Sequence, residues 1–402
     1  MRLLHNRSFI LLLLGNFVSR TGTVIYNIAL SWWITTQTGS TVAIGYILGA
    51  STIGTVLALP ISGVIVDYFN KKKILIVTDS ISAIAGIWVS ILIYREVENT
   101  FLYIVASFIL GLCSSIFKPA VKAIVPYIVH KEDFVKANSL SANIGEISKI
   151  IGPGVAAILM SAFPNGAAIS IFLDGISFGI SAISEVFIKA DEPNKEGRLK
   201  KSSFVNDFLD GFSYLKDNKT ILNIIMLSTV ANIFIASFDI VLPAYVYQII
   251  HEDEITYSNM LIFYAVGGMC VTLFMFFVKN IELKISKLYK YTAAIGVIFA
   301  ILSFGRNRMF LYVVVAVFGA VLGYFNTIFM SYVQLNVSEE FIGRIFSIVF
   351  SLALAGTPIS YVVYGYLGEK YLEMIFFVSG VLIFATALIF FAISFEPKRI
   401  HR

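Results

Sequence analysis

The sequence predicts an all-α integral membrane protein with twelve transmembrane helices in two six-helix bundles. Apolar stretches of spanning length fill nearly all of the 402 residues, and a helix of roughly 20 residues crosses about 30 Å of hydrocarbon. The composition is 58% hydrophobic and 14% charged, with a mean hydropathy of +0.84. A polar segment, 189–220, divides the stretches six and six.

The chain therefore divides into an N-terminal bundle over 1–188, a cytoplasmic linker over 189–220 and a C-terminal bundle over 221–402. The expected spans of the first bundle are 9–36, 41–66, 74–94, 101–124, 138–162 and 167–188. Those of the second are 221–249, 258–278, 289–305, 309–333, 345–368 and 372–395. The first apolar run continues past Trp33 without a small-residue cleavage pattern, so we interpret it as a span and not as a signal peptide.

The linker contains apolar residues at helical spacing, Phe204, Phe208, Phe212 and Leu215, with polar residues between them. This pattern predicts a short amphipathic helix on the cytoplasmic membrane surface. It serves either as a tether between the two halves or as a regulatory docking site.

The positions of the basic residues predict the orientation of the chain. With both termini in the cytoplasm, only four Lys and Arg residues of the loops lie outside: Arg95, Arg306, Arg308 and Lys370. Cytoplasmic loops retain most of the Lys and Arg in membrane proteins. We therefore expect a multi-pass plasma-membrane protein with cytoplasmic termini, and we interpret the basic character as topology and not as a nucleic-acid site. The abundance of Ile, Lys, Phe and Asn indicates a bacterial origin.

Several classes of chemistry are not expected. Cys113 and Cys270 lie inside apolar spans, which suits neither a disulfide framework nor a metal site. The stretch 175–179 fits a G-x-S-x-G nucleophile elbow, but it lies within a membrane helix and all four histidines fall in loops or tails. No phosphate-binding G-x-x-x-x-G-K-[ST] motif is present. We expect no enzyme activity, no cofactor and no metal.

A faint internal repeat supports two related halves. Glu132-Asp133-Phe134-Val135 precedes the fifth span, and Glu339-Glu340-Phe341-Ile342 precedes the eleventh. Gly152-Pro153 is expected to break the first of these helices and Thr357-Pro358 the second. Duplicated halves are typical of secondary transporters, whose substrate site lies near the membrane midplane between the repeats.

The loop after the second span, 63–73, resembles the G-x-x-x-D-(R)-x-G-R-R/K signature of the major facilitator superfamily. Gly63 is expected to let two helices approach closely, and Asp67 to accept a hydrogen bond. Asn70 replaces the usual Gly and is expected to tolerate a left-handed backbone. We interpret Gly63, Asp67, Lys71 and Lys72 as a gating loop; simple positive-inside anchoring is the alternative.

The opening segment and span five resemble the drug-efflux branch of this superfamily, which includes macrolide efflux proteins and the enterobactin exporter. The likeness is carried by 19–22, 29–33, 38–40, Pro119-Ala120, 137–139 and Asp174. Ser148, Gly152 and Pro153 are similar to the helix-breaking antiporter motif of its exporters. The resemblance implies the major facilitator fold, with spans one, four, seven and ten around a central cavity.

Ionisable residues within spans are the best pointers to a site, because their burial is costly. Arg20, flanked by Asn16 and Asn27, lies eleven residues beyond Phe9, roughly 16 Å deep. Glu146 and Lys149 share one face of span five and either neutralise each other or reach Arg20. Asp239, expected to be unpartnered, follows Asn232 in span seven. We assign the substrate and proton pathway to Asn16, Arg20, Asn27, Glu146, Lys149, Asn232 and Asp239.

Structural interpretations compete with this assignment. An Arg20–Glu146–Lys149 network would also lock helices together, and Asp174 on span six is expected to be a structural buried acid. The positions of Asp79 and Glu185 predict interfacial side chains. Lys118 and Lys122 are expected to snorkel to the cytoplasmic surface from the end of span four.

The sequence thus predicts a secondary active transporter that exports an amphipathic small molecule, such as an antibiotic, in exchange for protons. Asp239 or Glu146 would carry the proton, and Arg20 would hold the competing charge. An exporter of an anionic siderophore-like metabolite and a uniporter or importer of a polar nutrient remain alternatives, as does a membrane sensor. The expected partners are the lipid bilayer, a small-molecule substrate and protons, and we expect a monomer.

Overall fold

The computed structural model describes residues 2–190, 212–278, 283–338 and 341–394. These residues are almost entirely helical and include no β-strand. The chain divides into two compact units, Met1–Lys201 with Glu252–Ile262, and Ser202–His251 with Phe263–Arg402.

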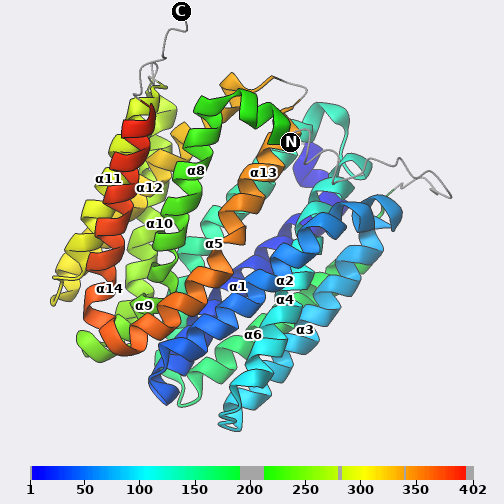
Figure 1. Cartoon of the computed structure of the whole chain (residues 1–402). Helices are drawn as coiled ribbons and strands as arrows, with labels where there is room; N and C mark the ends of the chain where they lie inside the picture. Colours follow the sequence, from blue (N-terminus) through cyan, green and yellow to red (C-terminus); the bar gives the residue numbers. More distant parts are fainter. Residues whose placement is uncertain (1, 191–211, 279–282, 339–340, 395–402) are drawn as a thin grey trace, which may run out of the picture. The chain divides into compact units, whose positions relative to one another are not determined.

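Six long helices build the first unit, coloured blue to green in Figure 1. They are α1 (Arg7–Thr38), α2 (Thr41–Tyr68), α3 (Lys71–Tyr94), α4 (Thr100–Ile124), α5 (Phe134–Ala162) and α6 (Gly166–Val186). Short 3-10 turns occur at Arg2–His5, Val125–Tyr127 and Lys131–Asp133. Helix α1 packs on α5 and α6, α3 packs on α4 and α6, and α2 packs on α4.

Polar side chains fix where these helices begin. Asn6, Ser40, Asn70 and Asn99 each precede a helix, and each side chain accepts a backbone N–H of the first turn. Gly39 closes α1 with a left-handed backbone, φ 63°, which a residue with a side chain rarely adopts. The two-residue connection between α1 and α2 follows from this combination of cap and glycine.

The second unit carries the remaining helices. They are α8 (Lys219–Ile235), α9 (Ser237–Ala244), a π-helical turn (Tyr245–Ile249), α10 (Glu254–Phe277), α11 (Ile285–Leu302), α12 (Arg308–Asn336), α13 (Ile342–Ala355) and α14 (Thr357–Ser394). Helices α8 and α9 with the π-turn form one continuous apolar span, Lys219–Ile249. The first turns of α10 belong to the first unit.

The predicted fold class is confirmed. Eleven helical segments of the described chain are long and apolar enough to cross a membrane. The last of them, Arg344–Ser394, is 51 residues long and contains a non-helical residue, Tyr371, with φ −131° and ψ 32°. Figure 1 shows the chain turning back between the orange and red parts of α14, so this segment holds the eleventh and twelfth spans.

Paired glycines hold the helices of the first unit together at close range. A methyl group on Gly54 of α2 would overlap the carbonyl oxygen of Phe108, and one on Gly111 of α4 would overlap that of Ser51. Gly86 of α3 and Gly175 of α6 form a second seam, where a Cβ on Gly86 would lie 3.1 Å from the Gly175 Cα. Close backbone approach through small residues is the usual packing mode of membrane helices.

The second unit repeats both seams. A Cβ on Gly267 of α10 would overlap the Ala316 carbonyl, and one on Gly319 of α12 would overlap the Tyr264 carbonyl. Gly296 of α11 and Gly380 of α14 form the other seam, with an added Cβ on Gly296 lying 2.6 Å from the Gly380 oxygen. The helices involved are spans two and four, then three and six, in both units. This correspondence indicates an internal duplication more firmly than the short sequence match before spans five and eleven.

One of the two predicted helix breaks is wrong. Helix α5 runs without interruption through Gly152-Pro153, because a proline removes a single backbone hydrogen bond and α1 packs along this helix. The other prediction is confirmed: α13 ends at Ala355 and α14 begins at Thr357, so the helix is interrupted just before Pro358.

Part of the predicted amphipathic helix in the linker lies outside the described residues, including Phe204 and Phe208. Residues 212–217 are helical, and Leu215 is fully buried.

Candidate functional site

A cavity of about 440 Å³ lies within the first unit and is lined by residues of all six of its helices. Its wall mixes side-chain hydroxyls and apolar groups with six charged side chains, which are Arg20, Lys118, Lys149, Asp79, Glu146 and Asp174. The hydroxyls come from Ser19, Thr23, Ser51, Thr55, Ser82, Ser107 and Ser114, and the apolar groups from Val24, Leu30, Leu48, Leu110, Phe117 and Phe178. Such a wall can hold both the polar and the apolar part of a ligand.

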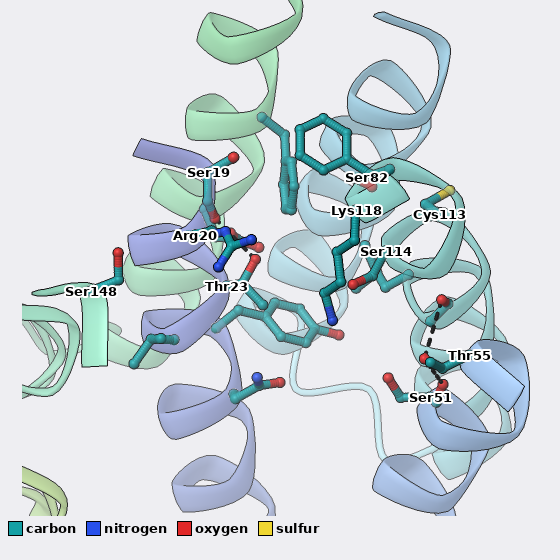
Figure 2. Close-up of a pocket in the computed structure, with 18 of the residues that line it drawn as sticks. Ser19, Arg20, Thr23, Ser51, Thr55, Ser82, Cys113, Ser114, Lys118 and Ser148 are labelled. Carbon is teal, nitrogen blue, oxygen red and sulfur yellow. Dashed lines mark hydrogen bonds between the residues drawn. The ribbon is translucent and has the colours of Figure 1, made fainter. Parts of the chain in front are cut away.

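Arg20 of α1 points its guanidinium into this cavity (Figure 2). Its Nε donates to Oδ1 of Asn16, one turn earlier, at 2.9 Å, and Asn16 is only 2% exposed. Its Nη1 lies against α5, where a Cβ added to Gly145 would come within 2.7 Å of it. Asn16 and the absence of a side chain at Gly145 therefore fix the orientation of Arg20. Asn27, two turns further along α1, also lines the cavity.

Lys118 of α4 reaches into the same space as Arg20 (Figure 2). The expectation that it snorkels to the membrane surface is wrong. Its side chain lines the cavity, because α4 places it on the inner face of the unit. The signal in the sequence was an ionisable residue within a span, but its nearness to the end of the helix suggested an interfacial position.

Glu146 and Lys149 form an ion pair on α5. Lys149 Nζ donates to Glu146 Oε1 at 2.8 Å. The Glu146 side chain is 61% exposed and the Lys149 side chain is 56% exposed. They line the cavity and neutralise each other, which was one of the two predicted arrangements. An ion pair exposed to this extent contributes little to stability.

The small residues of α5 serve its packing on α1. Ser148, only 1% exposed, shares a hydrogen bond of 3.0 Å with the Thr21 hydroxyl. A Cβ on Gly152 would lie 2.6 Å from Val24 Cγ1. With Gly145, these residues follow one face of α5, and that face brings α1 and Arg20 close to the helix. Pro153, the residue after Gly152, lies within α5 and does not break the helix.

Three carboxyl groups are buried in the same unit. Asp79, Asp174 and Glu185 are each 1% exposed, so the expectation that Asp79 and Glu185 are interfacial is wrong. The contact of α3 with α6 buries them, because Gly86 and Gly175 bring the two helices together. Both oxygens of Asp174 lack a hydrogen-bond partner among the described residues. A Cβ on Gly22 of α1 would lie 2.6 Å from Asp174 Oδ1, so this carboxyl group fills a seam between helices.

Asp239 of α9 has a partner, contrary to the prediction that it is unpartnered. The Tyr361 hydroxyl of α14 donates to Asp239 Oδ2 at 2.7 Å. The Asp239 side chain is exposed and lies outside the cavity of the first unit.

The Asp239–Tyr361 pair follows two one-residue interruptions of helical hydrogen bonding, at Ala236 and Gly356, where the backbone stays in the right-handed helical region. Helix α8 ends at Ile235 and α13 ends at Ala355. The interruptions touch, because a Cβ on Gly356 would lie 2.8 Å from Ile233 Cγ1.

Side-chain hydroxyls donate hydrogen bonds to backbone carbonyls at both interruptions. Ser237 Oγ donates to the Phe234 carbonyl at 2.7 Å, and Thr357 Oγ1 donates to the Ala353 carbonyl at 3.2 Å. Hydroxyls that compete in this way for backbone carbonyls weaken a helix locally. The Asn232 carbonyl accepts the Ala236 N–H at 3.0 Å, which places Asn232 one turn before the α8 interruption.

The loop after α2 differs from the prediction at two residues. A Cβ added to Gly63 would meet no atom within 4 Å, so Gly63 makes no close helix contact in this structure. Asn70 has an extended backbone, φ −61° and ψ 121°, and caps α3 instead of adopting a left-handed turn. Lys71 is only 6% exposed and lies over the Tyr127 ring at 5.9 Å. Asp67 is exposed and Lys72 is partly exposed, and their gating role stays a prediction.

The described residues contain no group of three or more His, Cys, Asp or Glu side chains arranged to hold a metal ion. The cavity and the Asp239–Tyr361 pair offer binding by charge, hydroxyls and apolar surface, together with proton exchange at carboxyl groups.

Comparisons with known proteins agree with this architecture. A family model described as transmembrane secretion effector matches residues 2–399. Macrolide efflux protein A of Streptococcus pyogenes is 23% identical over 381 residues, which cover 93% of each chain. The multidrug efflux pump Tap of Mycobacterium tuberculosis is 18% identical over 366 residues, 88% of this chain and 85% of the pump.

Solved transporters share the fold. The nucleoside transporter NupG is similar with a TM-score of 0.75 and 15% identity, over 96% of this chain and 99% of that one. A bacterial homologue of the iron transporter ferroportin, in an inward-facing state, gives a TM-score of 0.71 and 17% identity over 96% and 98% of the two chains.

Proposed function

We propose that this chain, which belongs to the transmembrane secretion effector family, exports an amphipathic small molecule in exchange for protons. The chain is a multi-pass membrane transporter of the major facilitator type, and its relatives are bacterial. Several of those relatives are named as efflux proteins for macrolides or for multiple drugs. An antibiotic of this kind is therefore the first cargo to test.

The observation that carries this proposal is the cavity of the first unit. Its volume of about 440 Å³ lies within the range of small-molecule sites. Hydroxyls and three cationic side chains, Arg20, Lys118 and Lys149, line it beside leucine and phenylalanine side chains. A ligand with one polar and one apolar end would satisfy both kinds of wall, whereas a purely apolar ligand would leave the charged groups without solvent or partner.

We place the proton site at Asp239 and Tyr361. Discontinuous membrane helices are where secondary transporters build sites for substrate and coupling ions. Here the pair comes directly after two interruptions that touch, and Tyr361 is the hydrogen-bond donor to the carboxyl group. Loss or gain of a proton at Asp239 would change this hydrogen bond and, with it, the packing of α9 on α14. Glu146 is the second candidate, but Lys149 already holds its carboxylate.

The transport cycle follows from this arrangement. The bundles 1–188 and 221–402 move as rigid bodies joined by the linker 189–220, and the cavity opens to each side of the membrane in turn. Arg20 holds the positive charge that makes binding of cargo and of proton exclude each other. Both termini lie in the cytoplasm of a bacterial cell, and the transporter acts as a monomer.

The test uses the purified full-length chain in liposomes with an imposed pH gradient. Transport of a radiolabelled macrolide is measured with the gradient and, separately, as exchange without it. We expect Asp239→Asn to abolish gradient-driven transport and to leave exchange in place, because exchange needs no net proton movement. Glu373→Gln, at an exposed carboxylate, is the matched control. Gradient-driven transport that survives both Asp239→Asn and Glu146→Gln would contradict the proton assignment.

A further inference from the structure

Two cationic side chains share the cavity of the first unit without a carboxylate partner. Arg20 and Lys118 come from α1 and α4 and reach into the same space (Figure 2). In the described part of the chain, no carboxylate oxygen lies within ion-pair distance of either group, and the Glu146 carboxylate of the same wall pairs with Lys149. The hydrogen bond that Arg20 donates to Asn16 joins it to a neutral amide. Two like charges are thus held beside one open volume.

The acids of the cavity wall do not neutralise this pair by contact. Asp79 and Asp174 also line the cavity, but each is only 1% exposed, and Oδ2 of Asp79 and both oxygens of Asp174 are buried. The Glu146 carboxylate, on the same wall, is bound by Lys149 at 2.8 Å. A ligand that enters the cavity therefore reaches Arg20 and Lys118 more readily than the buried oxygens of Asp79 and Asp174.

Side-chain hydroxyls line the cavity close in sequence to the two cationic residues. Ser114 lies on α4 one turn before Lys118, and Thr23 lies on α1 one turn beyond Arg20; both line the cavity. Arginine binds the two oxygens of a carboxylate or phosphate in parallel, while lysine adds a point charge. Phe117 and Phe178 supply apolar surface in the same wall.

We propose that this cavity binds an oxyanion, a carboxylate or phosphate group, of the transported molecule between Arg20 and Lys118. The apolar part of the cargo then lies on the leucine and phenylalanine side chains of the wall. This assignment rests on the proposed transport function and predicts that amphipathic anions bind more tightly than cationic amphipaths, because a cation brings a further positive charge beside Arg20 and Lys118. A macrolide with a protonated amine would then be a weaker cargo than an anion of similar size.

Binding of three dansyl probes to the purified full-length protein in a non-ionic detergent tests the proposal. Dansylglycine carries a carboxylate, dansylamide is neutral and dansylcadaverine is cationic, and all three share one apolar body. Calorimetric titration without any pH gradient gives their affinities. We expect dansylglycine to bind about tenfold or more tightly than the other two, since charge-assisted hydrogen bonds are the strong ones. Its affinity should fall as salt is raised.

Variants assign the binding to the two cations. Lys118→Gln should weaken dansylglycine binding about tenfold or more and leave dansylamide binding unchanged. Lys122→Gln is the matched control, because Lys122 lies one turn further along α4 and outside the cavity wall. Arg20→Gln should act like Lys118→Gln, and if it fails to fold, Lys118→Gln still decides the question. Equal binding of the three probes, or an unchanged affinity in Lys118→Gln, would overturn the proposal.

A second arm separates the cargo from a lipid headgroup. The dansylglycine titration is repeated in phosphatidylcholine nanodiscs with and without phosphatidylglycerol. We expect the same affinity in both; displacement of the probe by phosphatidylglycerol would assign the site to lipid and overturn its assignment to cargo. The titrations are made without a pH gradient, so a failure of proton coupling in liposomes is distinguishable from a failure of anion binding.

Discussion

Gly54 of α2 and Gly111 of α4 lie face to face, each against the carbonyl oxygen of the residue three positions before the other. Gly267 and Gly319 repeat this relationship between α10 and α12 of the second unit. Backbone contact of this kind excludes any side chain from the seam and fixes the two helices in one register. Each unit therefore contains a seam that is suited to moving as one body during transport.

Substitution of the seam glycine should destabilise the first unit. Gly111→Ala places a methyl group on the Ser51 carbonyl, and we expect a loss of about 1–3 kcal/mol from overpacking. Gly179→Ala is the control, because a Cβ there meets no atom within 4 Å. In a helix interior, Gly→Ala is otherwise favourable by about 1 kcal/mol. Thermal unfolding of the purified variants measures the difference, and equal midpoints would show that the seam can relax.

Hydropathy predicted the spans well because length and apolar content determine whether a helix can cross the bilayer. The glycine seams were not predictable in the same way. The chain has 28 glycines, and which of them face each other depends on helix rotation and pairing, which hydropathy does not fix. The two Pro-containing spans illustrate the limit: Pro153 stays within a continuous helix and Pro358 follows an interruption. Contacts with neighbouring helices decide between these outcomes.

The site was predictable only in part for a related reason. The search for ionisable residues within spans found Arg20 and the Glu146–Lys149 pair, which line the cavity. It assigned Lys118 and Asp79 to the membrane surface, because distance from a helix end was taken as depth. Hydropathy does not show which face of each helix points into the bundle, and that face decides whether an ionisable side chain lines the cavity. Gly145 was missed because its role, a place for the Arg20 guanidinium, exists only once α1 packs on α5.

Gly145→Ala should therefore impair anion binding more than folding. The added Cβ would lie 2.7 Å from Arg20 Nη1, at the end of a flexible side chain that can move aside. We expect normal expression and thermal stability, but a several-fold loss of dansylglycine affinity, because the guanidinium is displaced from its position in the cavity. Gly179→Ala again serves as the control. An affinity equal to that of the unchanged protein would mean that the position of Arg20 does not matter for an anionic ligand.

Asp239 and Tyr361 should act as one functional unit. If the tyrosine serves transport only through its hydrogen bond to the carboxyl group, Asp239→Asn, Tyr361→Phe and the double variant will not show additive losses. We expect the double variant to be no worse than Asp239→Asn in gradient-driven transport. Tyr94→Phe, at an exposed tyrosine near the end of α3, is the control. Additive losses would assign independent roles to the two residues.

Asp174→Asn should leave the first unit as stable as before or make it more stable. An ionised carboxylate is costly to bury without a partner, and the amide keeps the shape of the side chain and cannot ionise. Gly22→Ala should destabilise the unit, since its methyl group would lie 2.6 Å from Asp174 Oδ1 and would also overlap the Ser177 hydroxyl. Thermal unfolding compares the two variants. A large loss in Asp174→Asn would instead reveal a charge-dependent contact of this carboxyl group.

Tyr245 should stabilise the second unit more than the surface ion pair beside it. Its buried hydroxyl donates to the Ser303 carbonyl at 2.9 Å and accepts from Arg306 Nη1 at 2.5 Å. Tyr245→Phe removes both of these hydrogen bonds, one of them to a charged group, and should cost about 1–3 kcal/mol. Glu373→Gln removes the 3.5 Å contact with Arg306, where both side chains are more than half exposed, and should cost less than about 1 kcal/mol. Thermal unfolding ranks the two variants. The reverse order would show that the ion pair, and not the buried hydroxyl, fixes the connection between α11 and α12.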